Sequence, residues 1–570
     1  MKKCIFKFFA AVLSTSILLA GCSSKTAATD QTGATPTPGT SKEGTGSVNS
    51  GNTEKTDISW FLSVGVVPSK WDESQYVMKT ITEKTNVTVS ATTPAEDPDT
   101  KLNLMVVNGD LPDVITLSNG TLIKDIVEAG LVWNLQEFFE TYLPESHIIN
   151  GGFPEDVKTK LIDRDGDWFA FPSHILSPEN REKWGLNPAT EELWKSTDYR
   201  TNSGIIFNKT IMEQLGISED DVKTESGLLA TLEKVKQAKL TVNNASVIPI
   251  LPNGNAYQGD GWKSDGGGVG TLTTMFGGMP VNESGNYQSM YYNDQFKHAV
   301  SFLNKCAQSG YLDANTFTMD RAAFEAACRS GRVFCFVGNT ADTGFAFEGE
   351  WYTPGVILSD SGESPVLPRN STVGRGWLQT FVSKDTKNPE AVARFLDYMS
   401  SEEGLTNWIY GEKNVDYEVT ADGLYVKTEE GTQKSNNAGV TGLGAFWAFA
   451  NQNYDQKYMD PSNDGGIVPQ CAYGLNEATY KYDSAALDEL PGGYIESDQE
   501  MLTITTEIKT YAVTELANII LQATDSDFDS RYKALLEQLN KLGLPKVDEY
   551  IDKVVQENYK KLGYSLKPVN

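Results

Sequence analysis

The chain has 570 residues, with 76 Asp and Glu against 48 Lys and Arg, and its formal net charge is −28. This length exceeds what one hydrophobic core supports, so at least two lobes are expected. Nucleic-acid binding needs a basic face, and the acidic balance therefore argues against nucleic acid as a partner. The ordinary consequence of such acidity is solubility.

The first residues have the layout of a secretion signal. Three lysines precede an apolar stretch over residues 8–20, which is too short to span a bilayer. The stretch closes with Leu19-Ala20-Gly21-Cys22, which resembles a bacterial lipobox, because small residues suit the lipoprotein signal peptidase and a thiol suits lipid transfer. We expect residues 1–21 to be a signal peptide and Cys22 to be lipidated. The alternative is an ordinary secretion signal with a chance cysteine.

Residues 22–55 consist mainly of Ser, Thr, Gly, Ala and Pro. A segment of this composition cannot bury a core, so a disordered tether is predicted. No later stretch is long and apolar enough to be a transmembrane helix.

From residue 56 onward, short apolar strands alternate with amphipathic helices. Strands are predicted over 58–62, 87–91 and from 114, and helices over 76–84, 100–107 and 122–129. This alternation is typical of α/β lobes with parallel sheets, which bind ligands at the carboxyl ends of their strands. The strand from Val114 follows the motif Gly109-Asp-Leu-Pro-Asp-Val114. Asp113 in this motif invites a catalytic role, but a turn aspartate before a buried strand is favoured.

The middle of the chain contains an Asp165-Gly166 turn and a short aromatic strand over residues 167–171, stopped by Pro172. A second apolar strand over 203–207 leads through Phe207-Asn-Lys into a helix that ends at Gly216. The spacing of Asp163, Asp165 and Asp167 is similar to part of a calcium loop, but the distant glutamate is missing, so a plain turn and no metal site are predicted.

Further elements follow in the second half. Helices are predicted over 225–240, 296–310 and 321–329, and strands over 247–251, 333–337 and 373–383. The glycine-rich run 266–270 lacks the Lys-Ser/Thr of a phosphate loop, which favours a flexible loop. A helix should begin at Pro389 and end at Gly404, with Ala391, Phe395, Leu396 and Met399 on its buried face. Residues 527–570 should form C-terminal helices broken at Gly543-Leu-Pro545.

Four cysteines remain after Cys4 and Cys22: Cys306, Cys328, Cys335 and Cys471. None shows the C-x-x-C spacing of zinc or redox sites. Buried free thiols are the favoured interpretation, since free cysteine packs as a small hydrophobe. The alternative is one disulfide, which an extracytoplasmic protein can form.

Three motifs together resemble those of extracellular solute-binding lipoproteins of ABC importers, in the maltose-binding-protein-like, oligosaccharide-type group. They are the Gly109–Val114 segment, the crossover from Asp165 to Gly216, and the helix Asn388-Pro389 to Gly404. The resemblance implies an α/β, two-lobed periplasmic-binding-protein-like fold whose mainly parallel sheets are joined by a hinge. It assigns residues 56–172 and 373–415 to lobe one, and 200–370 and 430–525 to lobe two.

The resemblance also implies a function. The expected protein binds a carbohydrate, which in this group is an oligosaccharide, and delivers it to a membrane permease. It would sit as a monomer on the outer face of the bacterial cytoplasmic membrane, held only by its lipid anchor, and it would need no cofactor. The positions expected to pass the ligand cleft include Leu117 to Asn119.

Enzyme signatures are missing from the sequence. It contains three histidines, no H-E-x-x-H and no G-x-S-x-G elbow. We therefore predict no enzyme. A secreted glycoside hydrolase and a receptor for a non-sugar solute such as a peptide stay open as alternatives, because 76 acidic residues always allow some carboxylate pair.

Sugar sites combine flat apolar rings with amide, carboxylate and guanidinium groups. The candidate ligand-binding residues are those of these types in loops expected near the cleft: Asn119, Tyr199, Arg200, Trp262, Asn339, Trp377 and Trp447. Each is also compatible with packing in a core, since large aromatic residues are mostly buried.

Overall fold

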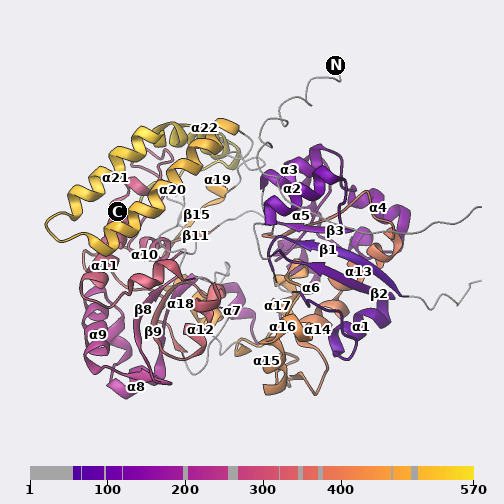
Figure 1. The fold of residues 1–570 in the computed structure, drawn as a ribbon, viewed down its shortest axis with the longest axis horizontal. Helices are drawn as coiled ribbons and strands as arrows, with labels where there is room; N and C mark the ends of the chain where they lie inside the picture. The colour runs from indigo at the N-terminus through magenta and orange to yellow at the C-terminus, as the bar shows by residue number, and fades with distance from the viewer. Residues whose placement is uncertain are drawn as a thin grey trace, which may run out of the picture. The chain divides into compact units, whose positions relative to one another are not determined.

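A computed structural model describes the chain over residues 55–65, 67–94, 98–118, 120–196, 203–253, 267–319, 321–343, 351–369, 376–463, 467–488 and 498–569 (Figure 1). Within these ranges, no helix combines the length and apolar character that crossing a bilayer demands. Across the same residues, no group of three or more His, Cys, Asp or Glu side chains is placed to hold a metal ion.

The first sheet has five strands in the order β2-β1-β3-β12-β4. Figure 1 labels β1, β2 and β3 of this sheet. Their bounds are β1 Thr56–Leu62, β2 Val87–Thr92, β3 Val114–Leu117, β4 Phe171–Pro172 and β12 Gln379–Val382. β1 is parallel to both β2 and β3, because the helices α1 (Tyr76–Thr85) and α2 (Pro98–Asn108) return the chain between them. The predicted strands over 58–62, 87–91 and from 114 are confirmed.

The aromatic strand predicted over 167–171 is wrong in length, since only Phe171–Pro172 pairs with the sheet. Trp168 is buried and its Nε1 donates to the carbonyl of Ala170 at 2.9 Å, which folds the segment on itself. The preceding Gly166 caps α5 (Glu155–Asp165) with φ of 82°. Asp165 pairs with Arg164 at 2.5 Å. The plain turn predicted over Asp163, Asp165 and Asp167 is confirmed only from Gly166 onward, because Asp163 and Asp165 belong to the last turn of α5.

The helices around the first sheet bury one apolar face each. They include α3 Gly120–Glu128, α4 Leu135–Tyr142, α13 Pro389–Ser400 and α14 Glu402–Tyr410. α13 packs against α1, α4 and β1, and its predicted buried residues Ala391, Phe395, Leu396 and Met399 all lie in the first core.

The prediction that this helix ends at Gly404 is wrong. Ser401 has extended backbone angles and divides α13 from α14. Its hydroxyl accepts a hydrogen bond from Gly404 N at 3.1 Å, which starts the new helix as an N-cap. A Cβ at Gly404 would overlap the carbonyl of Tyr398, so the glycine permits the tight turn and does not terminate a helix.

The second sheet has four strands in the order β10-β5-β9-β8. Their bounds are β5 Ser203–Asn208, β8 Ile248–Pro252, β9 Val333–Asn339 and β10 Trp351–Tyr352. β8 and β9 are parallel, and β5 is antiparallel to β9 and β10. The flanking helices are α8 Lys209–Leu215, α9 Glu225–Ala238, α10 Gly268–Met275, α11 Asp294–Gln308 and α12 Arg321–Arg329.

Mainly parallel sheets were predicted, but both sheets combine parallel and antiparallel pairs, and the topological reason is the same in each. β12 starts at Gln379, opposite Leu117 at the carboxyl end of β3. β5 starts at Ser203, opposite Asn339 at the carboxyl end of β9. β12 in the first sheet and β5 in the second sheet therefore each begin at the carboxyl edge and run antiparallel to the neighbouring β3 or β9. The chain segments that lead into β12 and β5 thus reach the sheets at the edges where α/β folds bind ligands.

The glycine-rich run 266–270 is not the predicted loop throughout, because α10 begins at Gly268 with Gly267 as its N-cap. Gly338 has φ of 134°, and a Cβ there would lie 3.4 Å from Gly268 N. The small residues therefore allow β9 and α10 to approach closely.

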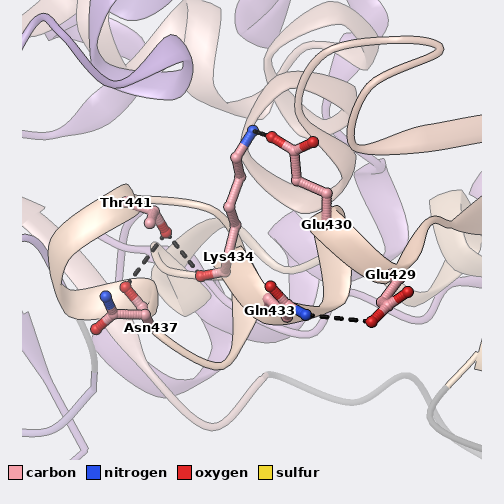
Figure 2. A pocket seen from close by; sticks show the side chains of 6 residues that line it. All are labelled: Glu429, Glu430, Gln433, Lys434, Asn437 and Thr441. Atoms are coloured by element: carbon pink, nitrogen blue, oxygen red, sulfur yellow. Dashed lines mark hydrogen bonds and ion pairs between the residues drawn. The ribbon is translucent and has the colours of Figure 1, made fainter.

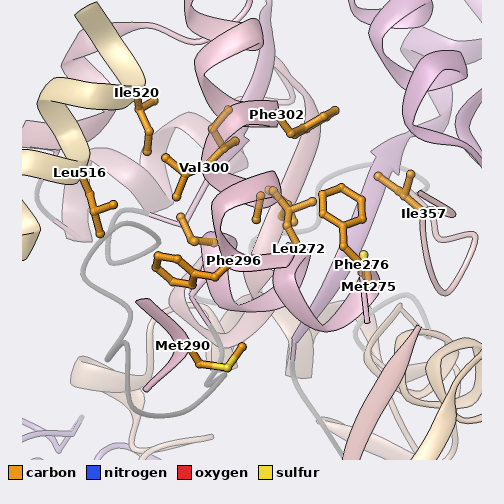
Figure 3. Close-up of a cluster of buried hydrophobic side chains, with 14 of the residues drawn as sticks. Leu272, Met275, Phe276, Met290, Phe296, Val300, Phe302, Ile357, Leu516 and Ile520 are labelled. Atoms are coloured by element: carbon orange, nitrogen blue, oxygen red, sulfur yellow. The ribbon is translucent and has the colours of Figure 1, made fainter. Parts of the chain in front are cut away.

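The helical assembly comprises α10, α11 and three C-terminal helices: α20 Gln499–Gln522, α21 Phe528–Leu542 and α22 Leu544–Leu562. Figure 3 shows side chains of α10, α11 and α20 meeting in one core, among them Leu272, Phe296, Val300, Phe302, Leu516 and Ile520. The predicted break at Gly543-Leu-Pro545 is confirmed, since Gly543 has φ of 111° and Pro545 stands in the first turn of α22.

The interval 430–525, assigned to lobe two by resemblance, contributes to both cores. Leu443, Phe446, Phe449 and Tyr454 lie in the core of the first sheet, whereas Leu475 and later apolar residues lie in that of the second. The elements of this region are β13 Tyr417–Val419, β14 Tyr425–Lys427, α15 Glu429–Ser435, α16 Ala438–Thr441, α17 Gln452–Tyr458, α18 Ile467–Ala478 and α19 Ala485–Asp488. β11 Val366–Arg369 pairs with β15 Tyr480–Asp483.

The four predicted buried thiols are confirmed as free and buried. Burial raises the pKa of both Cys328 and Cys471 to about 12, and it also raises the pKa of Cys306 and Cys335. These thiols therefore stay protonated and unreactive at neutral pH.

Candidate binding site at the first sheet edge

A cavity of about 570 Å³ opens at the carboxyl edge of the first sheet, and we call it the edge cavity. It is lined by residues that follow strands or begin helices, together with one aromatic ring and one leucine: Ser63, Val64, Pro98, Asp99, Ser118, Gly120, Thr121, Trp377 and Leu502. Its volume lies within the range of small-molecule sites.

The parallel strands explain why these residues gather. Leu62 pairs with Thr116, so β1 and β3 end at nearly the same level. Ser63 follows β1 and Ser118 follows β3, and both therefore project from one edge. The first turns of α2 and α3 meet them there, as in other α/β sheets.

Trp377 is the exposed aromatic residue of this edge. Its side chain is 48% exposed, although the neighbouring Leu378 is fully buried. Gly376 has φ of 80°, and a Cβ there would overlap the carbonyl of Ser173. Leu378 N donates to Ser173 Oγ at 3.0 Å, and Ser173 N donates to the carbonyl of Leu378 at 2.8 Å. The backbone on both sides of the indole is thus fixed, and its ring lies 6.0 Å from that of His174.

The polar lining of the cavity consists of hydroxyl groups and one carboxyl group. Ser63 Oγ is buried and has no hydrogen-bond partner within the described part of the chain. Ser118, Thr121 and Asp99 add two hydroxyls and a carboxylate. A buried hydroxyl without a partner is costly in free energy, so a ligand oxygen at Ser63 would remove that cost.

Asp113 precedes β3, at the opposite end of that strand from the edge cavity, and it stabilises the fold. Its Oδ2 accepts hydrogen bonds from Ser59 N at 2.8 Å and Ser59 Oγ at 2.7 Å, and its Oδ1 accepts one from Thr386 Oγ1 at 2.6 Å. Burial alone would raise the pKa of Asp113, but the hydrogen bonds from Thr386 and Ser59 outweigh burial and hold it below its usual range. The interpretation as a turn aspartate before a buried strand is confirmed.

The other candidates lie in different places. Asn339 is the half-buried last residue of β9, at the carboxyl edge of the second sheet. Trp447 packs against the first core, and its Nε1 donates to the carbonyl of Gly444 at 2.9 Å. Neither lines the edge cavity. Cys22, Asn119, Tyr199, Arg200 and Trp262 lie outside the described residues.

Comparison with known proteins decides the family. The family described as bacterial extracellular solute-binding protein matches residues 77–415, more than half of the chain. The chain belongs to this family.

A curated member similar to the chain is the fructooligosaccharide ABC transporter substrate-binding protein FusA of Streptococcus pneumoniae serotype 4. It is 23% identical over 369 residues, which make up 63% of this chain and 64% of FusA. The matched segment thus spans less than two thirds of that relative.

Solved structures show the same fold. A FusA EF-hand mutant in complex with fructo-nystose has a TM-score of 0.60 at 17% identity, covering 89% of this chain and 100% of that one. A solute-binding protein from Bifidobacterium longum infantis, described as binding HMO, has a TM-score of 0.58 at 15% identity, covering 89% and 99%. The predicted two-lobed periplasmic-binding-protein-like α/β fold is confirmed.

Within this family fold, the sequence indicated part of the edge cavity and missed the rest. Trp377 was a candidate, and Ser118 lies in the segment expected to pass the cleft. Ser63 and Thr121 were missed, although the rule that ligands bind at carboxyl ends of strands could have found Ser63 directly after β1. Leu502 carries no local signal, because it belongs to a helix more than a hundred residues beyond Trp377.

A second cavity of about 550 Å³ lies on α15 and α16 (Figure 2). Its charged groups bind one another: Lys434 Nζ lies 2.9 Å from Glu430 and 2.6 Å from the buried Asp416. Thr441 Oγ1 donates to the carbonyl of Lys434 at 2.8 Å. With these groups satisfied internally, this cavity offers less to a ligand than the edge cavity.

Proposed function

We propose that the chain is the oligosaccharide-binding receptor of an ABC importer and that the edge cavity holds part of the sugar. The observation that carries the proposal is the Trp377 ring, held 48% exposed by a fixed backbone in a cavity lined with hydroxyl groups. Sugars present apolar C–H faces and hydroxyl edges, so a flat ring and nearby polar groups match both.

The relatives support the same substrate class. FusA is named as a fructooligosaccharide-binding protein of an ABC transporter, and a structure similar to this one is described as an N-glycan transport solute-binding protein in complex with Man1GlcNAc. An oligosaccharide is therefore the first ligand class to test. Asn119, Tyr199, Arg200, Trp262, Asn339 and Trp447 remain proposed contacts alongside Trp377.

Transport follows from closure of the two lobes on the ligand. Closure buries the ligand and lets a permease distinguish the closed receptor from the open one. The partners are thus the sugar and the permease subunits of the importer, and the receptor acts as a monomer. We place the chain on the outer face of the cytoplasmic membrane, held by a lipid on Cys22, because the lipobox-like Leu19–Cys22 segment follows a short apolar stretch.

A thermal-shift screen against an oligosaccharide panel tests the proposal. A ligand at 100 times its dissociation constant adds about 2.7 kcal/mol to the free energy of unfolding, which is readily detected. Raised melting temperature without any shorter product supports a receptor. Hydrolysis of the sugars would support the glycoside hydrolase alternative, and stabilisation by peptides alone would support a different solute class.

Anchoring has its own test. Replacing Cys22 with alanine should abolish incorporation of labelled fatty acid and release the protein from membrane to medium. Unchanged labelling and retention would contradict the lipid anchor.

A further inference from the structure

One wall of the edge cavity comes from the C-terminal part of the chain. Leu502 lies in the first turn of α20 and lines the cavity together with Trp377. The segment that matches the solute-binding family ends at residue 415, so Leu502 lies outside it. The helical assembly thereby reaches a cavity whose other lining residues lie between Ser63 and Trp377.

The start of α20 is held firmly from several sides. Asp498 Oδ1 caps the helix by accepting from Glu500 N at 3.0 Å and Met501 N at 3.1 Å. Met501 is only 2% exposed and lies in the second core. Successive helical residues point about 100° apart, so burying Met501 turns Leu502 away from that core.

Contacts with the other C-terminal helices add to this support. Glu500 Oε1 lies 2.5 Å from Lys546 Nζ of α22. Ile504 packs close to Gly543, where a Cβ would come within 3.1 Å of its Cγ2. The position of Leu502 is therefore set by the packing of α20 against α21 and α22.

We propose that Leu502 is a specificity-determining residue of the sugar site, and this rests on the proposed function. Four of the nine lining residues carry a hydroxyl or carboxyl group, and Trp377 and Leu502 are the largest apolar side chains of the cavity. A leucine on a fixed helix offers an apolar contact for a sugar face and limits the room for additional sugar residues. The C-terminal helices thus set which oligosaccharides fit.

The first arm of the test asks whether residues 502 and 377 share the cavity, without any sugar. The chain from residue 22, carrying Cys22→Ser and Leu502→Cys, is labelled with bimane, a fluorophore that nearby tryptophan quenches. The buried native thiols resist labelling because their pKa is raised. Adding Trp377→Phe should raise the bimane fluorescence. The matched control is Leu562→Cys, at the exposed end of α22, whose label should not respond.

The second arm measures affinity for kestose and fructo-nystose by calorimetry, sugars found bound in structures of FusA. Leu502→Ala should weaken the binding of at least one of them by about three- to tenfold, through lost apolar contact. Leu502→Trp should lower the affinity for the longer sugar more than that for the shorter one. Leu562→Ala should change neither affinity, and all melting temperatures without ligand should stay close to that of the unmodified chain.

The outcomes separate the two proposals. If substitutions of Leu502 leave sugar affinity unchanged, or if Trp377 does not quench the bimane, the role of Leu502 is overturned. The proposed receptor function is not affected by either result. Quenching by Trp377 with no sugar bound at all overturns the oligosaccharide function, and with it the specificity role, while the shared cavity remains.

Discussion

The edge cavity and the helical assembly use large apolar side chains in opposite ways. Phe302 of α11 is fully buried, and its ring lies 6.2 Å from that of Phe276 in a T-shaped contact. Trp377 is 48% exposed and has a nearby ring only in His174 among the described aromatic contacts. A side chain surrounded by protein stabilises the fold, whereas one that its backbone holds exposed is available to a ligand. The surroundings of a large apolar side chain therefore decide whether it stabilises the fold or can bind a ligand, and its residue type does not.

The largest expected effect is in the helical assembly. Phe302→Ala should lower the free energy of unfolding by about 3–5 kcal/mol, because it removes buried surface and leaves a cavity. Urea denaturation followed by circular dichroism measures the loss. Trp377→Ala is the matched comparison and should cost far less stability, since its ring supports little core. Equal losses from the two variants would break the distinction between the regions.

The contrast also explains what the sequence could predict. The strands over 58–62 and 333–337 and the C-terminal helices carry strong local periodicity, so their existence follows from the residues alone. The break at Ser401 and the shortened strand at Phe171 depend on single contacts, with Gly404 N and within the Trp168–Ala170 turn. Local patterns contain no information about such contacts.

The site was harder to predict than the fold. Trp377 could be proposed as a flat ring in a glycine-containing segment, but nothing in its residue type separates it from buried tryptophans such as Trp60. Leu502 could not be found at all, because tertiary packing alone brings α20 to the edge cavity. Trp447 looked equivalent to Trp377 in sequence, yet it packs against the first core.

The second prediction concerns a buried carboxyl group of the helical assembly. Asp548 Oδ2 accepts from Ser289 N at 3.1 Å, whereas its Oδ1 is buried without a partner in the described part of the chain. Burial raises the pKa of Asp548 to about 7, and the nearby carboxyl group of Asp552 contributes to the increase. The folded form therefore binds more protons than the unfolded form between about pH 4 and pH 7.

Stability should accordingly fall as the pH rises through this window, by about 2–4 kcal/mol from this group. In Asp548→Asn this component should vanish, so the difference between variant and unmodified chain should change across pH 4–7. The control Glu549→Gln, at the exposed neighbouring position, should leave the profile unchanged. Parallel profiles for all three proteins would show that Asp548 is charged throughout.

A smaller effect is expected at the edge cavity. Trp377→Ala should weaken oligosaccharide binding by about 1.5–3 kcal/mol, because the ring loses its apolar contact with the sugar. Calorimetric titration gives the affinity, and a melting curve without ligand gives the stability. Trp60→Ala is the control, because its ring is buried in the first core and its loss should lower stability. A loss of stability with unchanged affinity for Trp377→Ala would reverse the assignment.

The smallest effect should come from Ser63→Ala. Removing an unpartnered buried hydroxyl should leave the stability without ligand unchanged or raise it by up to about 1 kcal/mol, because the cost of burying that group is removed, and the affinity for sugar should fall by about 0.5–1.5 kcal/mol. Calorimetric titration of the Ser63→Ala variant with the sugar measures the change in affinity. An affinity equal to that of the unmodified chain would place the sugar oxygens away from β1.

The most direct test is a crystal structure of the chain with an oligosaccharide that raises its melting temperature. We predict a sugar ring stacked on the Trp377 indole and a sugar oxygen within hydrogen-bond distance of Ser63 Oγ, in the edge cavity. A bound sugar that contacts neither residue while the edge cavity holds only water would show that the binding site lies elsewhere.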